Sequence, residues 1–146
     1  MVKNVMIIYI VAVISLYGAK AAPEIFDSLK KEEVKSQVQE FQWDGEVLNS
    51  FNGVANGPSG YETYYNLPMG GVVAIMRDLG YDETSYPYWV REDGVKMLGD
   101  YVMVAANLDE RPYGTILPSS LGMAIVCDTG TFAMSNPTQL DIAVDW

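Results

Sequence analysis

Three short apolar segments in the second half of the chain constrain the fold more than any other feature of the sequence. They occupy 101–106, 123–127 and 140–144, and Asp141 is the one charged residue among them. Runs of this length are typical of strands, and their nearly continuous apolar character indicates strands covered on both faces. Pro and Gly within 111–115 mark a turn between the first two segments. The sequence therefore predicts a mostly β fold.

Helical patterns are confined to two other parts of the chain. Residues 72–79 carry an apolar stripe at helical spacing, and Gly80 is placed to end a short inserted helix. Residues 24–41 carry an amphipathic stripe, which fits either a docked helix or a solvated spacer. Strand-like composition returns at 61–66, whereas 81–94 is polar, aromatic and irregular. We therefore expect helices only as additions to the strands.

The first residues have the pattern of an export signal. Lys3 precedes a mostly apolar run at 5–16, and small residues then surround a cleavage point after residue 21. The apolar run is shorter than the about 20 residues of a membrane span, and a retained N-terminal anchor is the alternative. We expect a signal peptide over 1–21, a helical N-terminal segment over 22–48 and one domain over 49–146. The protein is then secreted or associated with the cell envelope, and it meets a membrane only through an uncleaved signal.

Charge and composition exclude several classes of function. The chain carries 9 basic and 19 acidic residues and no histidine, for a net charge of −10. Nucleic-acid binding is not expected, because phosphate neutralisation requires clustered Lys and Arg. The missing histidine excludes Ser-His-Asp and Cys-His catalysis. Cys127 is the single cysteine, and its apolar neighbours indicate a buried, inert thiol.

No metal or cofactor is expected from the sequence. A phosphate-binding P-loop is absent, and no glycine cluster has the context of a dinucleotide site. Zinc sites built from Cys and His are excluded by the single cysteine and the missing histidine. Asn107, Asp109 and Glu110 lack the looped acidic spacing of a calcium site.

Asp128 and Asp141 are the best candidates for catalytic residues. With no imidazole in the chain, a carboxyl group must carry any proton that is transferred near neutral pH. Asp128 opens an Asp-Thr-Gly sequence after an apolar run, and Asp141 lies between Leu140 and Ile142. The Asp-Thr-Gly sequence is also typical of aspartic proteases, but only one copy is present. The 16 residues that follow Gly130 in this 146-residue chain are too few to complete a protease lobe.

Four motifs in the C-terminal half resemble those of the three-aspartate (3D) domain family. They are Val-Ala-Ala-Asn at 104–107, Pro-Tyr-Gly-Thr at 112–115, Ala-Ile-Val-Cys-Asp-Thr-Gly at 124–130 and Gln-Leu-Asp-Ile at 139–142. Thr-Tyr-Tyr at 63–65 resembles the early Thr-x-Tyr of that family. The family is a double-psi β-barrel related to the C-terminal part of membrane-bound lytic transglycosylase A. The resemblance implies a small six-stranded double-psi barrel with an N-terminal helix and one short inserted helix.

The resemblance also implies a function, cleavage of peptidoglycan glycan strands by a lytic transglycosylase. Asp141 would be the acid and base, its pKa raised by apolar neighbours and by the charge of Asp128, which would orient it or stabilise the transition state. Two positions depart from the family pattern. Asn107 replaces its first aspartate and Thr131 replaces the second glycine after Asp-Thr. Asparagine forms hydrogen bonds but carries no proton.

Five residues are expected to contact the glycan. Exposed aromatic rings suit stacking on sugars, and loop residues near the carboxylates shape the site. The substrate-binding candidates are Tyr65, Trp89, Asn107, Thr129 and Gly130. Two other interpretations remain open: a non-catalytic module that binds cell-wall glycan, and a structural protein whose barrel only presents a surface.

Overall fold

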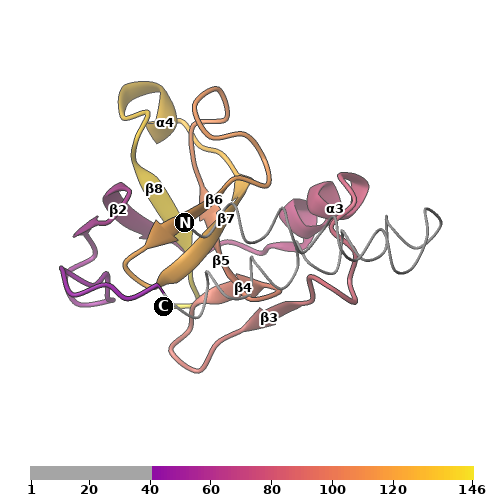
Figure 1. Ribbon diagram of the computed structural model, residues 1–146, viewed down its shortest axis with the longest axis horizontal. Helices are drawn as coiled ribbons and strands as arrows, with labels where there is room; N and C mark the ends of the chain where they lie inside the picture. Colours follow the sequence, from indigo (N-terminus) through magenta and orange to yellow (C-terminus); the bar gives the residue numbers. More distant parts are fainter. Residues whose placement is uncertain (1–40) are drawn as a thin grey trace, which may run out of the picture. The chain divides into compact units, whose positions relative to one another are not determined.

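The computed structural model describes residues 41–146, which form one compact unit, Phe41–Trp146 (Figure 1). The expected signal peptide and nearly all of the helix expected over 24–41 lie outside the described residues. The unit includes residues ahead of the expected domain start at 49, because Leu48 is fully buried and its backbone N–H donates to Ser120 Oγ at 3.0 Å.

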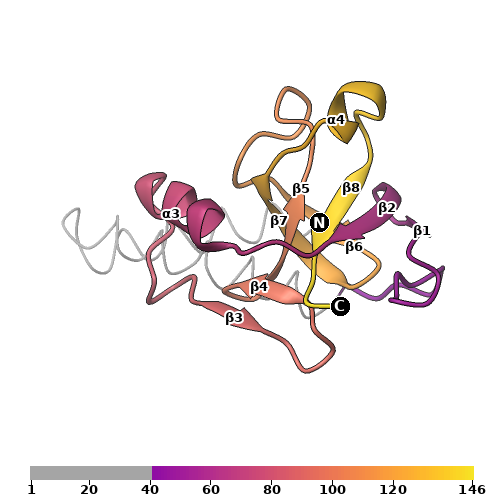
Figure 2. The ribbon, with the colours of Figure 1, turned by 180° about the vertical axis from the view of Figure 1, so that it is seen from behind.

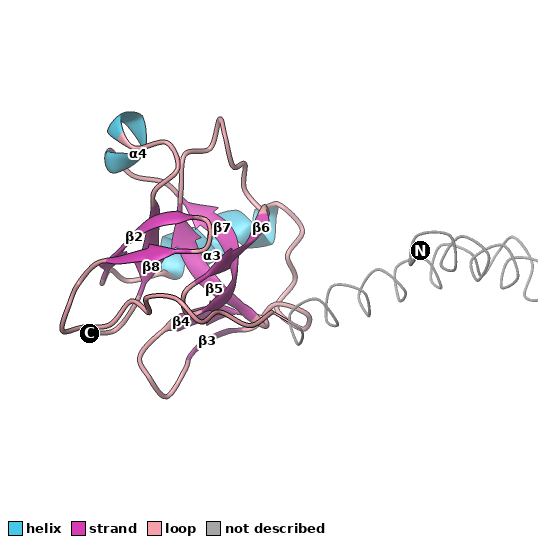
Figure 3. Cartoon of the chain, turned by 60° about the vertical axis from the view of Figure 1, so that its left-hand side comes forward, coloured by secondary structure: helices cyan, strands magenta, loops and turns pink. Residues whose placement is uncertain are grey.

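The mostly β class is confirmed, since the described residues contain a sheet of eight strands and two helices. The apolar segments that the sequence singled out are β5, β7 and β8, and the inserted helix is α3. The strands are β1 (Ala55–Gly57), β2 (Gly60–Tyr65), β3 (Tyr88–Val90), β4 (Lys96–Leu98), β5 (Tyr101–Ala105), β6 (Ile116–Ser119), β7 (Gly122–Asp128) and β8 (Leu140–Ala143). The helices are α3 (Gly70–Asp78) and α4 (Phe132–Ser135). The short α4 lies beyond the end of the sheet at which β8 begins (Figure 3).

Strand β5 is the centre of the sheet. It pairs in parallel with β7 along one edge, and its other edge is shared by β8 and β4, both antiparallel to it. Strand β2 continues the sheet in parallel with β8, as Figure 2 shows. The paired strands therefore run from β1 through β2, β8, β5 and β4 to β3, with β7 and β6 attached at β5.

Closure of the sheet into a barrel is not confirmed by these pairs. Strands β1 and β6 each end a series of paired strands within the described residues. Two side chains connect the β1–β2 hairpin with β6 and the turn that follows it. Ser59 Oγ donates to Pro118 O at 2.6 Å, and Ser120 N donates to Glu62 Oε1 at 2.9 Å. The double-psi topology remains a prediction.

Both faces of the central strands are buried, which explains their continuous apolar sequence. One face contributes Val104, Val126 and Ile142 to the main core. On the other face of β5 and β7, Met103 and Ile125 are fully buried, and α3 packs against β7. The expectation of doubly covered strands is therefore confirmed.

Candidate functional site

A β-bulge in β7 decides where the side chain of Asp128 points. Val104 pairs with Val126, but the next residue of β5, Ala105, pairs with Asp128, so Cys127 is the extra residue. Strict alternation would place Asp128 on the same face as Val126, in the main core. The extra residue instead aims Asp128 at the opposite face, which is how bulges commonly redirect a functional side chain.

The sheet register brings the two candidate carboxylates to that same face. Ala105 pairs with Asp128 of β7 on one side and with Asp141 of β8 on the other. Asp141 pairs in turn with Thr63 of β2. Residues that face each other across neighbouring strands project from the same side of a sheet. Asp128, Ala105, Asp141 and Thr63 therefore form one row across four strands, in which Ala105 stands between the two carboxylate residues.

A hydrogen-bond chain fixes the carboxylate of Asp141. Thr63 Oγ1 donates to Asp141 Oδ1 at 2.8 Å, and the same hydroxyl accepts a bond from Gln139 Nε2 at 2.9 Å. Gln139 is itself buried. Because the Gln139 amide donates to the hydroxyl oxygen of Thr63, the hydroxyl proton is directed at Asp141. This chain orients one oxygen of Asp141.

Two donors hold Asp128. Tyr65 Oη donates to Asp128 Oδ2 at 2.9 Å, and Thr129 N donates to Asp128 Oδ1 at 2.8 Å. Both oxygens accept, as in a carboxylate. Burial is the largest cause that raises the pKa of Tyr65, and the nearby Cys127 and Asp128 raise it further. The phenol therefore keeps its proton for this bond. The structure thus brings Tyr65 to the carboxylates through its hydroxyl group.

The electrostatics of Asp141 suit a proton donor. Partial burial of this side chain raises its pKa above the ordinary value of 3.8, and the charge of Asp128 raises it further. The hydrogen bond from Thr63 acts in the opposite direction, because it favours the charged form. Apart from that bond, these effects make Asp141 easier to protonate than a solvated aspartate.

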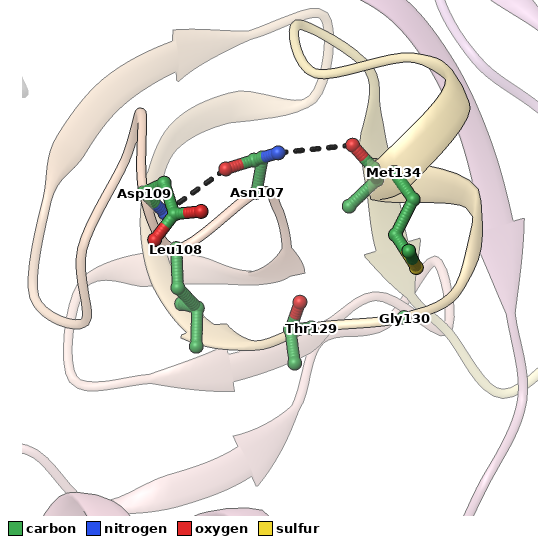
Figure 4. A pocket seen from close by; sticks show the side chains of 7 residues that line it. Asn107, Leu108, Asp109, Thr129, Gly130 and Met134 are labelled. Carbon is green, nitrogen blue, oxygen red and sulfur yellow. Dashed lines mark hydrogen bonds between the residues drawn. The ribbon is translucent and has the colours of Figure 1, made fainter.

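The side chain of Asn107 is used to hold two loops together. Its Oδ1 accepts bonds from Asp109 N at 2.9 Å and from Glu110 N at 3.1 Å. Its Nδ2 donates to Ala133 O, in α4, at 3.0 Å. Figure 4 shows the amide spanning between these two loops. The carbonyl oxygen has no further lone pair for a substrate. Asn107 therefore supports the site, and its expected contact with the glycan stays a prediction.

A pocket opens between the turn that follows β5 and the segment that follows Asp128 in the sequence (Figure 4). It has a volume of about 190 Å³. Thr129 and Gly130, expected to bind substrate, lie in its wall. Its lining residues are Asn107, Leu108, Asp109, Thr129, Gly130, Ala133 and Met134.

Trp89 is not brought to the carboxylates. It pairs with Met97 of β4, and Met97 pairs with Val102, whereas the carboxylates flank Ala105 near the other end of β5. The indole N–H donates to Gly99 O at 2.8 Å, and 43% of the residue is exposed. Its ring is available for contact, but at a separate place on the sheet.

Thr63, Ala105 and Gln139 belong to the site although they were not among the residues expected to form it. Thr63 and Tyr65 are two positions apart on β2 and so share a face. The spacing of Thr63 from Tyr65 in the sequence could therefore have predicted that Thr63 lies at the site. The small side chain of Ala105 matters only through pairings that the sequence does not reveal.

Residues 41–146 contain neither a metal-binding cluster nor a membrane-spanning helix. Within this range, no group of three or more His, Cys, Asp or Glu side chains is arranged to hold a metal ion. None of the helices described here has the length and apolar character needed to cross a membrane. Comparison with family models, curated proteins and solved structures finds no match for this chain.

Proposed function

We propose that this chain is a secreted or envelope-associated enzyme that cleaves peptidoglycan glycan strands by lytic-transglycosylase chemistry. The observation that carries the proposal is the row in which Asp128 and Asp141 flank Ala105 on one face of the sheet. The raised pKa of Asp141 supports its assignment as the proton donor. The choice of substrate rests on the resemblance of the C-terminal motifs to the 3D domain family.

The reaction needs one group that both gives and takes a proton. Protonated Asp141 donates its proton to the glycosidic oxygen, and the bond from that oxygen to C1 of the muramyl sugar breaks. The carboxylate of Asp128 stabilises the positive charge that develops at C1. Asp141, now ionised, removes the proton from the muramyl C6 hydroxyl, and this oxygen closes on C1. The product is a 1,6-anhydro sugar, Asp141 is protonated again, and no water is consumed.

The spacing of the two carboxylates is compatible with these separate roles. Neighbouring strands lie about 4.8 Å apart, so side chains on β7 and β8 stand two strand spacings apart across β5. Within the row, the residue between them is Ala105, whose side chain is short. A sugar ring approaching this face would meet one carboxyl group on each side.

A non-catalytic wall-binding module is the second candidate, and Asn107 favours it. The 3D domain family carries an aspartate at this position, whereas here an amide stands there and its hydrogen bonds are made within the protein. If the reaction requires charge at this point, the remaining groups bind glycan without cleaving it.

Mass analysis of digested peptidoglycan separates the two candidates. We expect the purified protein to release 1,6-anhydromuramyl products and the Asp141→Asn variant to release none. Asp100→Asn is the matched control, because Asp100 is exposed on the β4–β5 turn, and it should keep full activity. If the wild-type protein binds cell-wall material but releases no product, the enzyme proposal is wrong and the binding module stands.

A further inference from the structure

The pocket shown in Figure 4 is built where parallel strands end. Strands β5 and β7 are parallel neighbours, and the pocket walls are the segments that directly follow them. One wall is the turn at 107–110, and the other contains Thr129 and α4. The first pocket residue after β7 is adjacent in sequence to a carboxylate of the proposed site.

The walls of the pocket are held in place before any ligand arrives. Asn107 accepts from the backbone of its own turn and donates to Ala133 O in the opposite wall. This cross-link keeps the pocket open without movement of either loop. A pre-formed site loses less conformational entropy when a ligand binds.

The lining combines three apolar side chains, those of Leu108, Ala133 and Met134, with polar side chains and no cation. Leu108 and Met134 lie on opposite sides of the pocket, Asp109 lies next to Leu108, and Thr129 lies between the two sides (Figure 4). Met134 is 86% exposed, so its apolar surface is left to water in the absence of a ligand. Because the seven lining residues include an aspartate but neither Lys nor Arg, the pocket disfavours phosphate and carboxylate groups.

We infer that this pocket binds the acetamido group of an N-acetylated sugar, in the ring next to the bond on which Asp128 and Asp141 act. An acetamido group offers a methyl, an N–H donor and a carbonyl acceptor. The methyl fits between Leu108 and Met134, the N–H fits the carboxylate of Asp109, and the hydroxyl of Thr129 reaches the carbonyl. The volume of about 190 Å³ is below the roughly 300 Å³ at which pockets for larger ligands begin. The inference rests on the proposed function for its substrate class.

Binding of defined sugars to the full chain tests this inference. The probes are a tetramer of N-acetylglucosamine, the same tetramer without acetyl groups, and a glucose tetramer. In NMR titrations we expect only the acetylated tetramer to shift the amide signals of Thr129, Gly130 and Ala133. Met134→Ala and Asp109→Asn should each weaken that binding roughly three- to tenfold. The matched controls are Phe51→Ala, which removes a side chain that is 99% exposed elsewhere, and Asp100→Asn; both should bind like the wild type.

Two results would overturn the inference. One is equal binding of the acetylated and glucose tetramers, which would remove the role of the acetamido group. The other is tighter binding of the deacetylated tetramer, which would show that the pocket recognises an amine. The readout is independent of catalysis: acetyl-dependent binding without 1,6-anhydro products refutes only the proposed enzyme, whereas unchanged binding by both pocket variants in an active protein refutes only the pocket assignment.

Discussion

The buried side chain of Glu62 should make the folded protein less stable as the pH rises. Glu62 is 0% exposed on the core face of β2, and its Oε1 accepts a bond from Ser120 N. Within the described residues, its Oε2 has no hydrogen-bond partner. Burial raises the pKa of Glu62 above the ordinary 4.5, and the hydrogen bonds from Ser120 offset this only in part. The folded protein therefore holds a proton that the unfolded chain releases.

The sign and size of the effect follow from this difference in proton binding. Below pH 4.5 both states are protonated at Glu62, and the carboxyl group makes its full contribution to stability. Between pH 4.5 and the raised pKa, the free energy of unfolding falls by about 1.4 kcal/mol for each pH unit. Above the raised pKa the loss is complete and the curve levels off.

Urea denaturation from about pH 4 to about pH 8, compared between wild type and Glu62→Gln, measures the effect. The amide of the variant does not titrate. As the pH rises, the unfolding free energy of the wild type should therefore fall relative to that of the variant. Contributions from other groups, including Asp141, are present in both proteins and cancel. Glu83→Gln, at an exposed position, is the control and should follow the wild-type curve. Parallel curves for wild type and Glu62→Gln would refute the argument.

Three further substitutions test the site and the fold. Asn107→Asp replaces the amide that donates to α4, and we expect urea denaturation to show a loss of about 1–3 kcal/mol. Tyr65→Phe removes a donor to Asp128 and should lower the initial rate of 1,6-anhydro product formation roughly tenfold. This corresponds to a rise of about 1.4 kcal/mol in the activation free energy. An unchanged rate would contradict the role of this bond. Gly114→Ala should lower the melting temperature by several degrees, because Gly114 has φ +84° and an added Cβ would collide with the Tyr81 hydroxyl.

The elements that the sequence predicted well are those whose burial leaves a clear pattern of apolar residues. Strands β5, β7 and β8 were found because both faces are covered, and their apolar runs therefore needed no partner to be recognised. The helix expected over 72–79 is α3, which begins two residues earlier at Gly70. The stripe of apolar residues predicted it because one side packs against the sheet.

The elements that were missed are short, and β3 and α4 show two reasons why. Strand β3 lies in a stretch expected to be irregular, and all three of its residues are exposed. Among the strands of residues 41–146 it pairs only with β4, at the edge of the sheet, so burial imposes no alternating pattern on it. Helix α4 has four residues, too few for a helical period to appear in the sequence.

The sequence by itself determined which chemical groups are available. With no histidine, a carboxyl group has to carry any proton, and the motifs around Asp128 and Asp141 marked two of them. Only the tertiary structure decided that these two project from one face, because the direction of a strand side chain depends on pairing and on the bulge at Cys127. The same holds for Asn107: its sequence position suggested a ligand contact, and folding brought Ala133 O close enough to bind its amide.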